Sequence, residues 1–261
     1  MFPNPHETAT EEKRSALAIT AYSACNGLGT TTDEVLAALA ASRSGLRPPP
    51  LPVDFATLCG VVDESLPAVS GRFSAYDSRQ ARIALTTLDP IRATLDAAIR
   101  RWGRERIGLV LATSTGGIAV SEEAHRSLRR TGRVPPDYDF GRRHAFFAWA
   151  ELIRLVTGVA GPGHVVSTAC SSGGKALASA RRLIFAEIVD AVLVGGVDSL
   201  ALTTICGFGG LGVLSAEPCR PFSARRNGMN IGEGGAMLLL ERAGQARATL
   251  LGTGESSDAR N

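Results

Sequence analysis

This sequence has few aromatic residues, little excess of either charge sign and no long apolar segment. Aromatic side chains make up 5% of the 261 residues and the net charge is +3, so neither base stacking nor electrostatics favours a nucleic-acid partner. The first residues, MFPNPHETATEEKRS, lack the apolar segment of a signal peptide, and no apolar run is long enough for a membrane span. We therefore predict a cytoplasmic protein.

The five cysteines are irregularly spaced along the sequence. The spacing contains no CxxC pair, which argues against a zinc site, and the positions are Cys25, Cys59, Cys170, Cys206 and Cys219. We expect reduced thiols, as is usual for a cytoplasmic chain.

Apolar residues (44%) and charged residues (20%) occur in the proportions of a globular protein. We interpret residues 1–15 as a flexible tail and 16–261 as one domain. Strands are predicted over 16–25, 106–112, 164–168, 190–199, 234–242 and 247–256. Helices are predicted over 34–42 with Asp33 as N-cap, over 78–102 with a break at Pro90, and over 145–159 and 171–188, whereas 121–144 is expected to be partly loop. Apolar strands alternating with helices indicate a parallel-rich, layered α/β fold.

The segment VVSTACSSGG, residues 165–174, places Cys170 between a strand and a helix. The predicted helix carries Leu177, Ala180, Ile184 and Ile188 on one face. Free amide groups and the positive end of the helix dipole favour a thiolate and stabilise an oxyanion at this position. The alternative is that Cys170 is a small apolar residue at a tight turn, as most free cysteines are.

STACSSGG, followed by an amphipathic helix and DAVLVGGVDS, resembles the nucleophile segment of the β-ketoacyl-acyl-carrier-protein synthases, which are condensing enzymes of the thiolase superfamily. Three more segments, IGLVLATSTGG, GFGGLGVLSAEPCRPFSARRNGMNIGEGGAMLLLE and GTGESSDA, resemble that family in the same order. The resemblance implies an α/β, thiolase-like layered αβα fold, of which this chain carries the N-terminal half only. The sequences of these motifs most resemble those of the synthases of aryl polyene clusters.

The family resemblance implies that Cys170 accepts an acyl group and that a decarboxylated malonyl carrier then attacks the acyl-cysteine. The amide of Cys170 is expected to contribute to the oxyanion hole. Thr115 matches a position lining the acyl pocket, the alternative being an ordinary turn residue, and Phe208 lies near the pocket or in ordinary core. The implied partners are an acyl carrier protein bearing acyl and malonyl thioesters and a second subunit in a homo- or heterodimer; no cofactor or metal is implied.

The family's condensation step uses two histidines in motifs of its second half. The histidines of this chain, His6, His125, His144 and His164, match neither motif. After Ser256–Ala259 the family continues into that second half, whereas this sequence reads Arg260-Asn261. We therefore expect that condensation requires a longer protein or a second chain.

Two alternatives remain open from the sequence. The first is a truncated or non-catalytic partner subunit, although such partners lack the cysteine that is present here. The second is a cysteine hydrolase, which needs a histidine beside the thiol. Four arginines either meet an acidic carrier protein or form a solvated basic face: Arg181, Arg182, Arg225 and Arg226.

Overall fold

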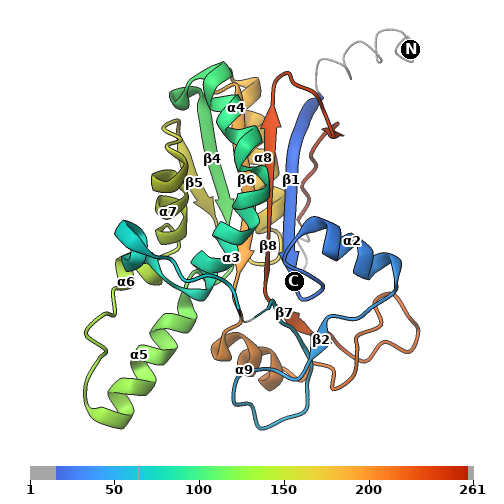
Figure 1. Ribbon diagram of the computed structural model, residues 1–261. Helices are drawn as coiled ribbons and strands as arrows, with labels where there is room; N and C mark the ends of the chain where they lie inside the picture. The colour runs from blue at the N-terminus through green and yellow to red at the C-terminus, as the bar shows by residue number, and fades with distance from the viewer. Residues whose placement is uncertain (1–15, 64, 258–261) are drawn as a thin grey trace.

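The computed structural model describes residues 16–63 and 65–257, so the predicted tail over 1–15 lies outside the described residues. A six-stranded sheet in the order β5-β4-β6-β8-β1-β9 runs through the upper part of the molecule (Figure 1). Its strands are β1 (Leu17–Asn26), β4 (Ile107–Ala112), β5 (Gly163–Val166), β6 (Ala191–Asp198), β8 (Gly234–Glu241) and β9 (Ala248–Leu250). All six predicted strands therefore form, although β9 is much shorter than the predicted 247–256.

The sheet is mixed, and the prediction of a parallel-rich sheet is wrong for three of its five strand pairings, which are antiparallel. β4 pairs in parallel with β5 and β6, whereas β8 pairs antiparallel with β6 and β1, and β1 pairs antiparallel with β9. Every residue of β4 is buried, because helices cover both faces of the sheet. A continuous apolar run in a strand indicates that both faces of the strand are buried. It does not by itself determine whether the strand pairs in parallel or antiparallel.

Helices cover both faces of the sheet and produce an αβα arrangement. One face carries α3 (Arg79–Leu88), α4 (Arg92–Trp102) and α7 (Ala148–Thr157), and the other carries α8 (Ser172–Phe185). The prediction of a helix broken near Pro90 is confirmed, because the 3-10 turn η2 (Asp89–Ile91) separates α3 from α4. Proline cannot donate the backbone bond that a continuous helix needs there.

Smaller elements surround this core. A three-stranded sheet in the order β2-β3-β7 lies below the main sheet beside α9 (Figure 1). The bounds are β2 (Leu46–Arg47), β3 (Cys59–Gly60), β7 (Ile231–Gly232), α9 (Leu202–Gly210), α2 (Thr32–Ala40), η1 (Gly71–Tyr76) and η3 (Arg104–Arg106). The predicted N-cap Asp33 is wrong: Thr31 caps α2 in a capping box with Glu34, and Asp33 lies inside the helix.

The polar stretch 121–144 is more helical than expected. α5 (Ile118–Thr131) takes up its first part and ends where Gly132 adopts a left-handed conformation. A loop then leads to the short helix α6 (Phe140–Arg143). Only Ala124 of α5 is buried, so the helix lacked the apolar stripe on which a sequence-based prediction depends.

The face of α8 that packs on the sheet consists mainly of alanine. Ala176, Ala180 and Ile184 are buried against β4 and β6, and small side chains let the helix approach the strands closely. Ala180 and Ile184 were predicted on this face. Ile188 was also predicted there, and this is wrong, because the helix ends at Phe185 and Ile188 is 50% exposed.

We expect Ile184→Ala to lower the free energy of unfolding by about 2–5 kcal/mol, because it leaves a cavity beneath α8. Ile188→Ala is the matched control and is expected to change it by less than about 0.5 kcal/mol, as for an exposed side chain. Urea unfolding followed by circular dichroism measures both values. Equal losses in the two variants would contradict this account of α8.

Candidate active site

Cys170 lies in the turn between β5 and α8 and is exposed. Serine side chains brace the turn from within: Ser172 Oγ accepts from the amide of Thr168 at 2.8 Å and donates to the carbonyl oxygen of Ala169 at 2.6 Å. Ser171 is the N-cap residue of α8, but its hydroxyl donates to the Thr168 carbonyl oxygen at 2.8 Å and makes no capping bond. Ser171 therefore leaves the amide groups at the start of α8 uncapped beside Cys170.

The residue before the thiol has an unusual backbone conformation. Ala169 has a φ of 53°, in the left-handed region where a Cβ crowds the backbone. Such a conformation persists only where surrounding bonds hold it, and the Ser172 hydroxyl supplies one such bond at the Ala169 carbonyl oxygen. The turn is thus held in one tight shape with Cys170 at its tip.

A cavity of about 730 Å³ opens beside the thiol, a size typical of small-molecule sites. Its lining includes Cys170, Thr115 and Phe208, the three residues that the sequence predicted for the site. They come from the β5–α8 turn, the turn after β4, and α9 respectively. Thr115 and Phe208 are both half-buried, so each presents part of its side chain to the cavity.

The glycines of TSTGG allow another segment to pass close behind Thr115. Gly116 has a φ of 61°, and a Cβ there would lie 2.5 Å from the carbonyl oxygen of His144. A Cβ on Gly117 would lie 1.8 Å from the carbonyl oxygen of Arg143. Any larger residue at these positions would displace the turn that carries Thr115.

Asp198, at the end of β6, holds the Thr115 turn in place and was missed by the sequence-based reasoning. Its carboxylate accepts from Thr113 Oγ1 at 2.6 Å and from the amide of Ser114 at 2.9 and 3.0 Å. The Thr115 amide donates to the same carboxylate at 3.3 Å. The available signal was the position of Asp198 after an apolar strand, because ends of parallel strands meet at one edge of a sheet.

Glu233, in the GEG segment, is buried and joins three parts of the chain. It accepts from the amides of Val62 at 3.1 Å and Leu200 at 3.2 Å, and it forms an ion pair with Arg79 at 2.6 Å. The neighbouring Gly232 lines the cavity. Glu233 therefore connects the loop before α9 to the segment whose Gly232 lines the cavity.

Removing the charge of Glu233 should destabilise the fold. We expect Glu233→Gln to cost about 3–5 kcal/mol, because it leaves Arg79 and two buried amides without their full partner. Glu217 forms an exposed pair with Arg220 and provides the control, since Glu217→Gln should cost no more than about 1 kcal/mol. Thermal unfolding of both variants measures the difference, and equal midpoints would contradict the role of Glu233.

Neither His125 nor His144 nor His164 lines the cavity beside Cys170 within the part of the chain that the structure describes, and His6 lies outside it. His144 hydrogen-bonds Ser121, and burial holds its pKa below the usual range. His164 Nε2 hydrogen-bonds Ser179 Oγ at 2.9 Å. A histidine beside the thiol, which the cysteine hydrolase alternative needs, is therefore not found among the described residues.

Residues 16–63 and 65–257 contain no group of three or more His, Cys, Asp or Glu placed to hold a metal ion. Across the same residues, no helix combines the length and hydropathy that crossing a membrane requires.

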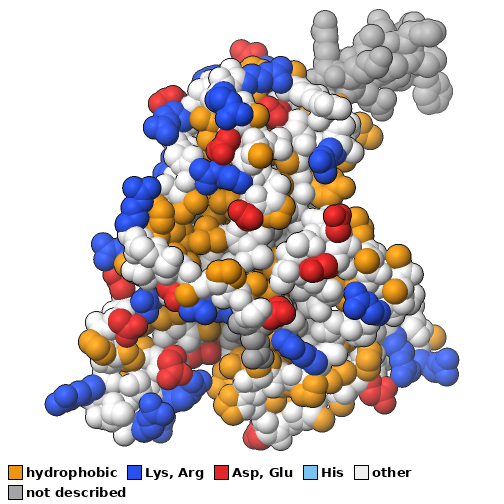
Figure 2. Space-filling model, viewed as in Figure 1, with side chains coloured by type: hydrophobic (Ala, Val, Ile, Leu, Met, Phe, Trp, Pro, Cys, Tyr) orange, Lys and Arg blue, Asp and Glu red, His pale blue; other side chains and the backbone are white. Residues whose placement is uncertain are grey.

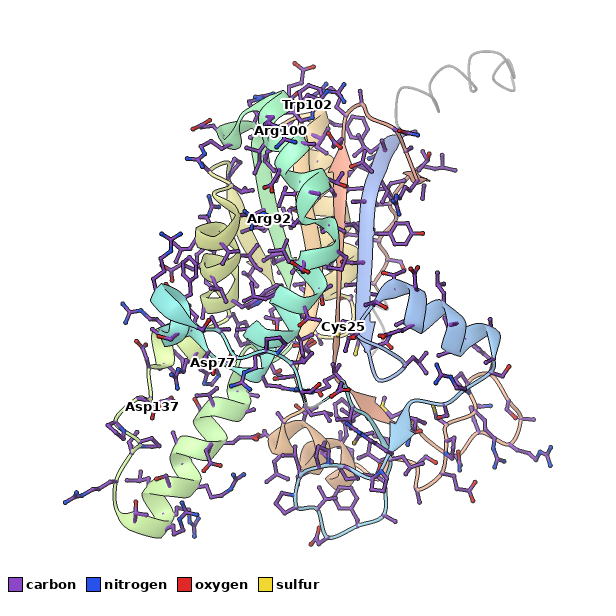
Figure 3. The ribbon with its side chains drawn as sticks, in the orientation of Figure 1. Cys25, Asp77, Arg92, Arg100, Trp102 and Asp137 are labelled. Carbon is purple, nitrogen blue, oxygen red and sulfur yellow. The ribbon has the colours of Figure 1, made fainter. Side chains whose placement is uncertain are left out.

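The cysteines differ in exposure and in acidity. Cys25 is buried at the lower end of β1 (Figure 3), and burial raises its pKa to about 11. Burial also raises the pKa of Cys59, whereas Cys170 and Cys206 are exposed. Since the thiolate is the reactive form, the buried pair should react slowly with alkylating agents.

We expect iodoacetamide, applied to the folded protein at about pH 8.5 where an ordinary thiol is half ionised, to modify Cys170 and Cys206 well before Cys25 and Cys59. Peptide mass spectrometry over a time course measures the order. In urea, all of these sites should react at similar rates, which controls for peptide detection. Early modification of Cys25 in the folded protein would contradict the burial described here.

Comparisons with known proteins agree with this geometry. The family model described as "Beta-ketoacyl synthase, N-terminal domain" matches residues 14–246. Nodulation protein E of Rhizobium meliloti (strain 1021) is 30% identical over 260 residues, which cover 92% of this chain and 63% of that protein. The 3-oxoacyl-[acyl-carrier-protein] synthase 2 of the same strain is 31% identical over 176 residues, covering 58% of this chain and 40% of that protein.

A solved structure shares the fold. The ketosynthase ApeO of Xenorhabdus doucetiae, in complex with its chain length factor ApeC, has a TM-score of 0.81 and 32% identity, covering 94% of this chain and 61% of that one. The chain thus spans about three fifths of the length of nodulation protein E and of this ketosynthase.

Proposed function

This chain belongs to the β-ketoacyl synthase family, and we propose that its Cys170 accepts an acyl group from an acyl-carrier-protein thioester. One observation carries the proposal: an exposed thiol at the start of α8 opens into a cavity of about 730 Å³. The cavity has an apolar portion that includes Phe208, Leu211 and Met229, which suits an acyl chain. Membership of the family supplies the reaction class, an acyl transfer.

In the proposed acylation, the sulfur of Cys170 attacks the thioester carbonyl carbon. A new carbon–sulfur bond forms to Cys170, the bond to the carrier sulfur breaks, and the proton of the Cys170 thiol ends on the released carrier thiol. The Cys170 amide, at the start of the helix, stabilises the oxyanion of the intermediate. Thr115 and Phe208, which line the same cavity as the thiol, contact the acyl group.

We propose that the whole protein completes a 3-oxoacyl-carrier-protein synthase reaction. A malonyl carrier loses carbon dioxide, the resulting carbanion attacks the acyl carbon on Cys170, and the sulfur of Cys170 leaves as the 3-oxoacyl carrier forms. The cavity in the described residues offers no histidine for this second step. The groups that drive decarboxylation therefore come from a segment beyond this sequence or from a second chain. The motif resemblance favours aryl polyene intermediates as the acyl groups.

The proposed partners are an acyl carrier protein and a second subunit. A related ketosynthase was solved together with its chain length factor, which supports a homo- or heterodimer here. Figure 2 shows Lys and Arg side chains gathered at the lower left, over the end of α5, where Arg129, Arg130 and Arg133 are exposed. This basic surface and the exposed Arg182, Arg225 and Arg226 would attract an acidic carrier protein.

Incubation with an acyl carrier protein thioester should add one acyl group to the chain, and peptide mass spectrometry should place it on Cys170. Cys170→Ala should lose the adduct, whereas Cys206→Ser, which removes the other exposed cysteine, should retain it. Acylation that survives Cys170→Ala, or its absence from the unaltered chain, would overturn the proposed function.

A further inference from the structure

Glu122, on α5, reaches across to the first turn of α9. Its carboxylate accepts hydrogen bonds from the amide of Leu202 at 2.9 Å and from the amide of Thr203 at 2.6 Å. These amides belong to the start of a helix, where backbone donors have no partner inside the helix. A carboxylate there also compensates the positive end of the helix dipole. Glu122 thus performs the task of a capping residue from a separate helix.

Away from its first turn, α9 is held by packing: Phe55 lies against Gly209, and Ile205 is buried in an apolar cluster. Its own N-cap residue, Ala201, has no side chain that could cap it, and Ile205 is the buried residue within it. Three glycines, Gly207, Gly209 and Gly210, lie in its second half and weaken a helix. At the start of α9, Glu122 therefore supplies the capping bonds that Ala201 does not.

A second cavity, of about 410 Å³, lies on the side of α9 that faces α5. Its lining includes Glu122, His125 and Arg126 from α5, and Leu202 and Cys206 from α9. Close packing does not fill this space, so here the bonds of Glu122 are direct links between α5 and α9. The carboxylate of Glu122 spans the space between α5 and the first turn of α9.

On an adjoining face, α9 forms a wall of the cavity that contains Cys170. Thr203, Thr204, Gly207 and Phe208 all line that cavity. A shift of α9 would change the width of the space beside the thiol. Thr203 links the two features directly: its amide binds Glu122, and the residue also borders the Cys170 cavity.

We propose that Glu122 is a positioning residue whose hydrogen bonds to the start of α9 fix the wall of the Cys170 cavity and so set which acyl chains the thiol accepts. The proposal rests on the proposed acylation of Cys170. Glu122 does not line the Cys170 cavity itself, so it acts through α9. Its removal should therefore alter selectivity among acyl chains more than it alters the chemistry of the thiol.

The experiment compares Glu122→Ala with Glu123→Ala. Glu123 is the adjacent residue on α5 and forms an exposed pair with Arg126, so both variants remove one carboxylate from the same helix. Amide hydrogen exchange over residues 202–208 should accelerate roughly tenfold in Glu122→Ala, because two capping bonds are lost, and stay unchanged in Glu123→Ala. Exchange in the sheet strands should be the same in both variants, which excludes general unfolding.

Acylation of Cys170 is then measured with carrier thioesters of short, medium and long acyl chains. The ratio of rates between long and short chains should shift severalfold in Glu122→Ala and remain at the wild-type value in Glu123→Ala. Glu122→Gln keeps one acceptor oxygen and should lie between wild type and alanine. If Glu122 only stabilised the fold, its removal would lower the acylation rates of all chains by the same factor. The ratio between long and short chains would then stay unchanged.

An unchanged ratio in Glu122→Ala, or equal exchange of α9 in the two alanine variants, would overturn this inference while leaving the proposed function intact. Absence of any adduct on the wild-type chain would overturn the proposed function together with the selectivity role that depends on it. Should Glu122→Ala fail to fold, the same two measurements on Glu122→Gln decide the matter, because that side chain is nearly isosteric.

Discussion

The parallel pairing of β4 with β5 and β6 is the constraint on which the site depends. Ala112, the last residue of β4, is paired with Val166 of β5 and Gly196 of β6. The segments that follow these strands leave the sheet at the same edge. The turns carrying Thr115 and Cys170 and the carboxylate of Asp198 therefore meet there, although they are far apart in sequence.

Carboxylates then hold the irregular backbone around this edge. Asp198 accepts from the turn after β4, Glu233 accepts from the loop before α9, and Glu122 accepts from the first turn of α9. Turns and helix ends leave amide groups unpaired, and an unpaired donor shielded from water is costly. An acidic side chain from another element satisfies several of these donors at once and fixes the position of each loop relative to the cavity.

How much could be predicted from the sequence varied with the kind of signal. The strands, the break at Pro90 and the turn of Cys170 were predictable, because apolar runs, proline and glycine act on the local backbone. The capping residue of α2 was misplaced by two positions, since Thr31 and Asp33 are both common N-cap types. α5 was underestimated because Ala124 is its single buried residue, so the sequence shows no apolar stripe there.

The sequence by itself determined the family, the strand order along the chain and the residue that carries the thiol, because each is expressed in local motifs. Only the tertiary structure decided strand direction, the gathering of Thr115, Cys170 and Phe208 around one cavity, and the roles of Asp198, Glu233 and Glu122. The reason is physical: a carboxylate that binds backbone amides 33, 80 or 84 residues away leaves no periodic pattern in the sequence. Which acidic residue binds which amides is determined only when the tertiary structure brings them together.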